Sequence, residues 1–342
     1  MKSIEEIKKE FQDLPGHLQE KLLDELLTDY EMRGQVLDNV NHELANNKKK
    51  KPCPYCTSEK VYKRGKQNGM QMYQCKECKK WYSESTGTPL WNIKLKHKWQ
   101  GYLRCMEQGK SIKKIALEIG VCIQTSFDWR HKILSSLSEF APKELSDEVE
   151  CDELELALSK KGCKNLDRKP RKRGNDFRRN DKSEESTVVQ VITAVERKGE
   201  KFFRAVESKR LSAKEISKAL DGKLAGHTTL ITDKHPSYRL YAKQNQNIKH
   251  KTVLAKEHVS KKDKNIHLQH VNNMHSQLRS FLLPFKGVSS KYLQNYLNWF
   301  AYAPMLLGTK ATIKQWFLAI LAAPLAYDLF CLFKENAVNI RL

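Results

Sequence analysis

The sequence predicts an α/β domain with a mixed sheet and flanking helices, preceded by a zinc-binding module and a helical domain. Three observations support this prediction: two closely spaced cysteine pairs, a run of helical apolar spacing after them, and alternating strand-like and helix-like segments in the second half. The 342 residues are enough for two or three domains, at least one of them with a sizeable core.

The chain is strongly basic, with a formal net charge of +22. A fold does not require such an excess, which indicates a polyanionic partner or a surface that only keeps the protein in solution. The cations cluster near aromatic residues, which favours nucleic acid. The first residues lack the apolar stretch of a signal peptide, and the apolar segment 316–333 contains Pro324 and Asp328. We therefore expect a cytoplasmic, nucleoid-associated protein without a membrane span.

Residues 1–47 form the first predicted segment. Apolar residues at helical spacing predict two helices, which Pro15 and Gly16 separate. The segment either binds a partner or clamps DNA, or it only assists folding, because its residues suggest no chemistry.

Residues 48–90 contain four cysteines in two pairs with 18 residues between the pairs. This spacing places four thiolates around one tetrahedral Zn²⁺ ion as a zinc ribbon. A disulfide is the weaker alternative, because the nine cysteines are an odd number and no secretory leader is present. Structural zinc contributes about 10–16 kcal/mol to the folding of such small modules. The four proposed ligands are Cys53, Cys56, Cys75 and Cys78.

Residues 91–142 predict three helices. Ser111 is a suitable N-cap for the middle helix, and Gly120 makes a tight turn into the third, which is the helix-turn-helix pattern. The alternative is a plain three-helix bundle. In the third helix we expect Ile123, Phe127 and Leu134 to face inward, and Gln124, Thr125, Asp128 and Arg130 to be exposed to base edges and phosphates.

Residues 146–305 predict the α/β domain. A first strand is followed by a hairpin, a short helix, a further strand and two helices. The alternation of the first strand slips near Asp152 and Glu153, which predicts a bulge or a strand end there. The predicted elements are the strand 148–158, the hairpin strands 187–194 and 201–207, the helix 212–220, the strand 228–232, and the helices 272–283 and 291–302.

A basic insert interrupts this domain at residues 160–182. It is too polar to pack, so we expect it to be disordered or ordered by DNA, with Arg171, Lys172 and Arg173 at phosphates. Residues 306–342 are expected to form a C-terminal helical segment.

Two aspartates are the candidate catalytic residues. Asp152 lies on the first strand, and Asp233 follows the apolar strand 228–232. An acidic residue on an apolar strand is costly to bury unless it binds a cation. On neighbouring strands the two could hold Mg²⁺ ions, which activate the attacking oxygen and stabilise the leaving oxygen in phosphoryl transfer. Alternatively, Asp233 caps the next turn and Asp152 is solvated.

Short motifs in the second half resemble the bacterial insertion-sequence transposases of the ISXO type. They occur in the family's order at residues 149–153, 232–238, 250–253 and 270–275, and the resemblance covers roughly residues 50–303. It implies a zinc ribbon, a helix-turn-helix and an RNase-H-like catalytic domain. The catalytic triad of that domain is two aspartates and a glutamate, asparagine or histidine.

The resemblance also assigns residues. Asp152 and Asp233 match the two metal-binding aspartates, and His275 falls where many relatives have glutamate. A neutral imidazole suits Mn²⁺ better than Mg²⁺, and acid should weaken its binding near its ordinary pKa of about 6.5. Alternatively, His275 is a surface or capping residue in an inactive copy. Glu153 could be an extra metal ligand or could orient the site, as could His270 and Asn272, and Arg279 or Lys286 could hold a phosphate.

The resemblance implies a DNA transposase that binds the terminal repeats of its element. It would use Mg²⁺ or Mn²⁺ to hydrolyse a phosphodiester and join the resulting 3′-hydroxyl to target DNA. Its partners would be double-stranded DNA, both element ends and target, and further copies of itself, since two ends must be brought together. The alternatives are a catalytically inactive relic that acts as a DNA-binding protein or regulator, and a zinc-ribbon module of a transcription complex.

Overall fold

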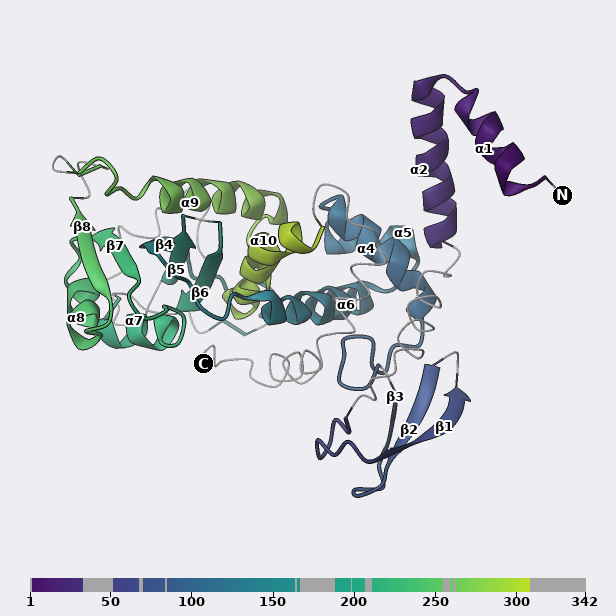
Figure 1. Cartoon of the computed structure of the whole chain (residues 1–342), viewed down its shortest axis with the longest axis horizontal. Coiled ribbons are helices and arrows are strands. Elements are labelled where there is room, and N and C mark those ends of the chain that lie inside the picture. Colours follow the sequence, from purple (N-terminus) through teal and green to yellow (C-terminus); the bar gives the residue numbers. More distant parts are fainter. Residues whose placement is uncertain are drawn as a thin grey trace. The chain divides into compact units, whose positions relative to one another are not determined.

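The structure is a computed structural model (Figure 1) in which the described residues form two compact units. The division falls between Trp129 and Arg130, inside helix α6 (Ile123–Ser136). Arg171, Lys172, Arg173 and the segment 308–342 lie outside the described residues. In the described part of the chain, no helix is long and apolar enough to cross a membrane. The described residues are 2–32, 52–67, 70–83, 85–163, 165–166, 188–197, 199–206, 211–254, 259–260 and 263–307.

The first unit begins with the two predicted helices. Helix α1 (Ile4–Gln12) starts with a capping box, in which Ser3 and Glu6 each bind the other's backbone N–H. Helix α2 (Gly16–Met32) follows directly after Pro15. Helix α1 buries none of its residues, so its apolar positions are not part of a core.

The cysteine-rich segment forms a three-stranded antiparallel sheet. Its strands are β1 (Val61–Gln67), β2 (Met70–Cys75) and β3 (Trp81–Ser83), with β2 in the centre. In the described part of this segment the core consists of a few side chains, and the centres of the stacked Tyr73 and Tyr82 rings are 5.3 Å apart. Such a small core needs an additional constraint to be stable.

Three helices follow as predicted. Helix α4 (Trp99–Glu107) packs beside α5 (Ile112–Ile119), and α6 comes next. The Ser111 hydroxyl accepts a hydrogen bond from the backbone of the first turn of α5, which confirms the N-cap. Gly120 ends α5 with a φ of +66°, a conformation that costs glycine least.

The second unit contains a five-stranded mixed sheet. The spatial order is β6-β5-β4-β7-β8, with β4, β5 and β6 antiparallel and β4, β7 and β8 parallel. This confirms the predicted mixed sheet and agrees with the RNase-H-like domain that the family resemblance implies. The strands are β4 (Glu148–Ala157), β5 (Val188–Glu196), β6 (Lys201–Val206), β7 (Thr229–Asp233) and β8 (Lys249–Val253).

The structure differs from the sequence prediction at three places in this unit. Strand β4 pairs with β5 without a break from Val149 to Ala157, so the predicted bulge near Asp152 and Glu153 is wrong. The alternation of apolar and polar residues is interrupted because the consecutive residues Asp152 and Glu153 place acidic side chains on both faces of the sheet. The backbone of the strand is regular. The sequence prediction also omitted helix α8 (Pro236–Gln244) and strand β8.

Helices cover both faces of the sheet (Figure 1). Helices α7 (Ala213–Leu220) and α8 lie on one face, and α9 (Gln269–Leu282) and α10 (Leu293–Leu307) lie on the other. Side chains of β4 alternate between these layers: Cys151 packs with the α7 and α8 core, and Leu154 packs with α9 and α10. Even-numbered residues of β4, Asp152 among them, therefore face α9.

Candidate functional site

The two candidate aspartates lie on neighbouring parallel strands. Strands β4 and β7 pair at Glu148–Thr229 and Glu150–Ile231, and the same register continued by two residues sets Asp152 opposite Asp233. Adjacent strands are about 4.8 Å apart. Ile231 packs in one cluster with residues of α9, and Asp233 follows it by two, so both carboxylates belong to the α9 face.

Negative charge is concentrated at this point of the sheet. Burial, with the nearby charges of Glu153 and Asp233, raises the pKa of Asp152 to about 7. Burial and the charge of Asp233 also raise the pKa of Glu153. A divalent cation would relieve the repulsion among these groups, because carboxylate oxygens are its preferred ligands.

Asp233 also caps the turn that follows β7, which was the alternative interpretation of this residue. One of its carboxylate oxygens accepts a hydrogen bond from the backbone N–H of His235 at 2.9 Å, at the turn that leads into α8. This bond fixes the side chain at the end of β7. Turn capping and placement beside Asp152 are therefore compatible.

His275 lies on the buried stripe of α9, between Val271 and Leu278. Burial, assisted by the charge of Arg279, lowers the pKa of His275 to about 4, so the imidazole is neutral at pH 7. This corrects the expectation of protonation near 6.5. Its Nε2 atom is buried and has no hydrogen-bond partner among the described residues. A neutral imidazole with an available nitrogen is what a metal ligand requires.

The three candidate ligands do not form a closed cluster in the described structure. Their donor atoms are not all within 4.8 Å of one another, and no hydrogen bond or ion pair joins His275 to Asp152 or Asp233. Two carboxylates and one neutral imidazole nevertheless suit Mg²⁺ or Mn²⁺ by donor type. The residues present therefore fit a divalent ion.

Glu150 fixes the start of helix α9. This side chain is fully buried on β4, two residues before Asp152. Its Oε2 atom accepts the backbone N–H groups of His270 at 2.9 Å and Val271 at 3.2 Å. A carboxylate at this position satisfies unpaired N–H groups and complements the helix dipole.

Three side chains complete the surroundings of this carboxylate. His270 Nδ1 lies 2.7 Å, His267 Nδ1 3.2 Å and Arg197 Nε 3.5 Å from Glu150 Oε1. Two ligands of one tetrahedral zinc would lie about 3.4 Å apart, so 2.7 Å indicates a direct hydrogen bond. We call this set of contacts, which links β4 to α9, the Glu150 anchor.

The remaining predicted residues around the site have different positions. His270 acts on α9 through Glu150, whereas Asn272 is exposed and its side chain makes no hydrogen bond to the site among the described residues. Glu153 follows Asp152 on a continuous strand and so projects from the opposite face. Arg279 is exposed one turn beyond His275.

The four cysteines form a second candidate metal centre. Their sulfur atoms all lie within 4.8 Å of one another, with Cys53–Cys78 and Cys56–Cys75 each at 3.5 Å. The thiols are not linked, and two sulfurs on one tetrahedral zinc would lie about 3.8 Å apart. The arrangement of four unlinked thiols favours a metal site over the disulfide alternative, and the donor set fits zinc.

The two cysteine loops have matching backbone conformations. Thr57 and Lys79, the residues that follow each pair, both have positive φ, at 58° and 61°. Although desolvation acts to raise it, backbone hydrogen bonds from Cys78 and Glu77 lower the pKa of Cys75 to about 6. A thiolate at this position is ready to bind a metal.

The predicted contacts of α6 with DNA are only partly compatible with the structure. Gln124 is exposed and donates a hydrogen bond to Asp128 at 3.0 Å, and Thr125 is half-buried. Arg130 was predicted to be exposed but is buried, with its guanidinium 5.3 Å from the centre of the Trp299 ring. Ile123, predicted to face inward, is 53 % exposed. Arg130 therefore stabilises the second unit and is not a candidate DNA contact.

Known families and relatives match this chain. Residues 144–303 match the family model described as the ISXO2-like transposase domain. A protein described as an uncharacterized protein in transposable element ISH50, from Halobacterium salinarum, is 25 % identical over 255 residues. That match covers 72 % of this chain and 83 % of the relative.

Solved structures overlap with the chain only loosely. A pre-cleavage Mos1 transpososome matches with a TM-score of 0.31 and 12 % identity, over 71 % of this chain and 80 % of that one. A simian T-cell lymphotropic virus intasome, in complex with PP2A regulatory subunit B56 gamma, matches with a TM-score of 0.30 and 12 % identity. That match covers 63 % of this chain and 73 % of the other.

Proposed function

We propose that the protein is a DNA transposase, because residues 144–303 match the ISXO2-like transposase domain and a relative of the chain belongs to a transposable element. It binds the terminal repeats of its element, hydrolyses a phosphodiester with the help of a divalent metal, and transfers the strand to target DNA. The observation that carries this proposal is the pair Asp152 and Asp233, opposite one another on β4 and β7 beneath α9.

The chemistry requires these two aspartates and His275 to hold Mg²⁺ or Mn²⁺. When bound, the metal activates the attacking oxygen and stabilises the leaving oxygen. Asp152 must first give up the proton that its raised pKa retains near pH 7, whereas His275 is already neutral. Arg279 would hold a phosphate of the bound strand through its guanidinium.

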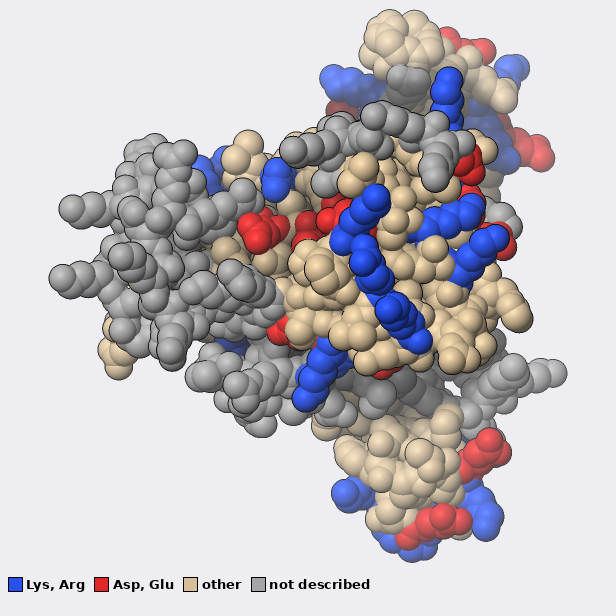
Figure 2. Space-filling view, turned by 90° about the vertical axis from the view of Figure 1, so that its left-hand side faces the viewer, with Lys and Arg blue, Asp and Glu red and all other residues tan. Residues whose placement is uncertain are grey.

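The second unit has a cationic surface that suits the DNA backbone. Residues 234–254, which include α8 and β8, contain no aspartate or glutamate. Helices and strands at the left of Figure 1, α8 and β8 among them, face the viewer in Figure 2. Lys and Arg side chains cross the middle of this face. The exposed cations of this segment include Lys234, Arg239, Lys243 and Lys249. Their charges would attract phosphates without selecting a base sequence.

The first unit would recognise the element ends. On the zinc ribbon, the cations of Lys80 and Lys76 lie 4.7 and 4.6 Å from the ring centres of the exposed Tyr55 and Tyr62. Exposed rings beside cations suit the stacking and phosphate contacts of nucleic acid. Helices α5 and α6 would act as a helix-turn-helix, with Gln124 at base edges. Zn²⁺ on the four cysteines would maintain the ribbon.

Synapsis of two element ends requires more than one copy of the catalytic site. The protein would therefore assemble as a dimer or a larger homo-oligomer on DNA. Its place of action would be the cytoplasm, at the nucleoid, where element and target DNA are found.

Strand cleavage and joining test the proposal. A labelled DNA that carries the element's own ends, taken from the flanks of its gene, is incubated with the full chain and Mg²⁺, then Mn²⁺. We expect metal-dependent nicking and joining that Asp152→Ala and Asp233→Ala abolish while end binding persists. Glu144→Ala changes an exposed carboxylate outside the site and should leave the rate unaltered.

The outcome distinguishes an active transposase from an inactive relic that only binds DNA. Cleavage that survives in both aspartate variants would exclude the proposed site. Specific end binding without cleavage in either metal would indicate the inactive relic or regulator, and His275→Glu would then show whether the third ligand is responsible.

A further inference from the structure

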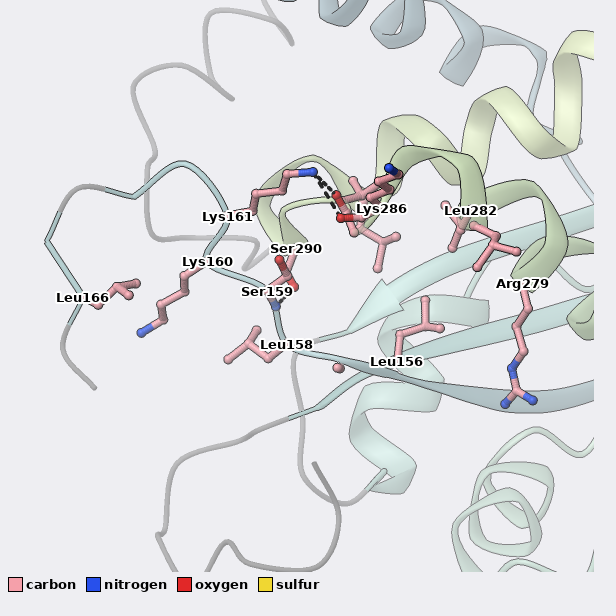
Figure 3. Close-up of a pocket in the computed structure, with 15 residues that line it drawn as sticks. Leu156, Leu158, Ser159, Lys160, Lys161, Leu166, Arg279, Leu282, Lys286 and Ser290 are labelled. Atoms are coloured by element: carbon pink, nitrogen blue, oxygen red, sulfur yellow. Dashed lines mark hydrogen bonds between the residues drawn. The ribbon is translucent and has the colours of Figure 1, made fainter. Parts of the chain in front are cut away.

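A pocket of about 610 Å³ lies beyond the candidate active site (Figure 3). It is formed between the end of β4 with the residues after it and the segment that runs from α9 to Leu293. Its volume is in the range of small-molecule and cofactor sites. Its apolar lining includes Leu156, Leu158, Leu282, Leu283, Val288 and Leu293.

The walls of this pocket are fixed by hydrogen bonds. Lys161 Nζ donates to the carbonyl oxygens of residues 285–287 at 2.7 to 3.3 Å, as Figure 3 shows for two of them. Ser159 N–H donates to Ser290 Oγ at 2.8 Å, and Ser290 N–H donates to the Ser159 carbonyl at 2.8 Å. The two sides are thus joined by the chain itself, so the pocket exists before any ligand enters.

The lining combines an apolar floor with positive charge. Among the described residues that line it are Lys160, Lys161, Arg279 and Lys286, and none of those described is an aspartate or glutamate. Arg279 and Lys286 are exposed at the edge of the pocket. This chemistry suits a ligand that joins a flat apolar ring to an anionic group, as a nucleotide does.

The position of the pocket relates it to DNA at the active site. Leu156 lies four residues beyond Asp152 on the same face of β4, about 13 Å along the strand. Arg279 lies one helical turn beyond His275 on α9. The roughly 13 Å from Asp152 to Leu156 corresponds to about four nucleotides along one strand of B-form DNA.

We propose that this pocket receives an unstacked nucleobase from the DNA strand bound at Asp152 and Asp233. The base lies between the leucine side chains, and its phosphate is bound by Arg279 and Lys286. Nucleobases taken out of a helix are held between apolar side chains in enzymes that extrude them. This inference rests on the proposed function and adds a nucleotide-binding subsite next to the site of chemistry.

The test is the fluorescence of 2-aminopurine placed at single positions of the end DNA. The DNA is bound by the full chain carrying Asp152→Ala, so that the strand stays intact. We expect a several-fold rise in fluorescence at one or two positions a few nucleotides from the cleaved bond. Val288→Trp, which fills the pocket, and Leu283→Asp, at its 77 % exposed rim, should remove the rise.

A matched control is Ile7→Trp, on α1 outside the pocket and outside the cationic segment 234–254, where the side chain is 54 % exposed. It should retain the fluorescence change. Bound DNA that gives no rise at any position, or a rise that survives both pocket variants, would overturn the subsite while cleavage by the wild-type chain stands. Failure to bind the ends at all would overturn the proposed function and this subsite with it. Thermal unfolding of each variant identifies a loss of fold, which the change at exposed Leu283 avoids.

Discussion

Asp152 carries a charge that destabilises the metal-free protein. Its pKa is raised from 3.8 to about 7, so the folded chain binds this proton more tightly than the unfolded chain. The free energy of unfolding should therefore fall as the pH rises between these two values, and stay low above them. Asp152→Asn removes the charge and should stabilise the metal-free protein at pH 8 by about 2 kcal/mol, with solvent screening taken into account.

Urea unfolding at pH 5 and pH 8, without added Mg²⁺ or Mn²⁺, checks this prediction. The variant should gain less at pH 5 than at pH 8, because at pH 5 Asp152 is still protonated in the folded state and only the unfolded chain is ionised. Mn²⁺ should stabilise the wild-type chain at pH 8 and not the variant. If Asp152→Asn is no more stable than the wild-type chain at pH 8, the charge of Asp152 does not destabilise the folded protein.

The Glu150 anchor should contribute strongly to the stability of the second unit. Glu150→Gln removes the charge that binds two backbone N–H groups and faces Arg197 and His270. Breaking a buried, hydrogen-bonded charge costs about 3 kcal/mol. Chemical denaturation should show this loss, together with faster hydrogen exchange in the first turn of α9. Glu144→Gln, at an exposed carboxylate, should be neutral, and an equally small effect of Glu150→Gln would contradict the anchor.

At the scale of elements, the ribbon should depend on its metal. Its core contains only a few side chains beside the cysteines, so removal of the ion removes most of the folding free energy, about 10 kcal/mol or more. Cys75→Ser should release zinc and abolish the near-ultraviolet circular dichroism of the stacked Tyr73 and Tyr82. Cys105→Ser, at a cysteine outside the cluster, should retain the metal. A ribbon that keeps its signal after zinc removal would show that the ion is dispensable.

The sequence predicted most elements because their patterns are local. The apolar runs of β5 and β7, the capping serine of α5 and the glycine after α5 each indicate their element within a few residues. Strand β8 was missed because its sequence, Lys-His-Lys-Thr-Val, has a single buried apolar side chain at the edge of the sheet. Helix α8 was missed because it is short and mostly polar.

The candidate site was predictable only in part, because some of its contacts join residues that are far apart in the sequence. Asp152 and Asp233 were found because acidic residues interrupt or end apolar strands. Glu150 was not found, although it too lies among apolar neighbours, because its partners His270 and Val271 are 120 and 121 residues away. No local pattern contains such a contact. Arg130 was misplaced because its partners, Phe285 and Trp299, are equally remote.

At the scale of the whole molecule, the net charge of +22 should make DNA binding strongly dependent on salt. Each phosphate neutralised contributes about 0.9 to the slope of log affinity against log salt. The double variant Lys243→Ala and Lys249→Ala removes two exposed cations, so the slope should fall by about 1.8. Gln244→Ala, an exposed uncharged neighbour, should leave it unchanged. Fluorescence anisotropy over a salt series measures the slope, and an unaltered slope would place the DNA elsewhere.

The Glu150 anchor has an evolutionary consequence. Helix α9 is attached to the sheet at its first turn, while the candidate third ligand, His275, lies further along the same helix. The start of the helix is therefore held by contacts that do not involve the candidate third ligand. A lineage could exchange histidine and glutamate at position 275 while the start of α9 stays attached to the sheet. The residue that holds the helix is thus distinct from the candidate metal ligand on it.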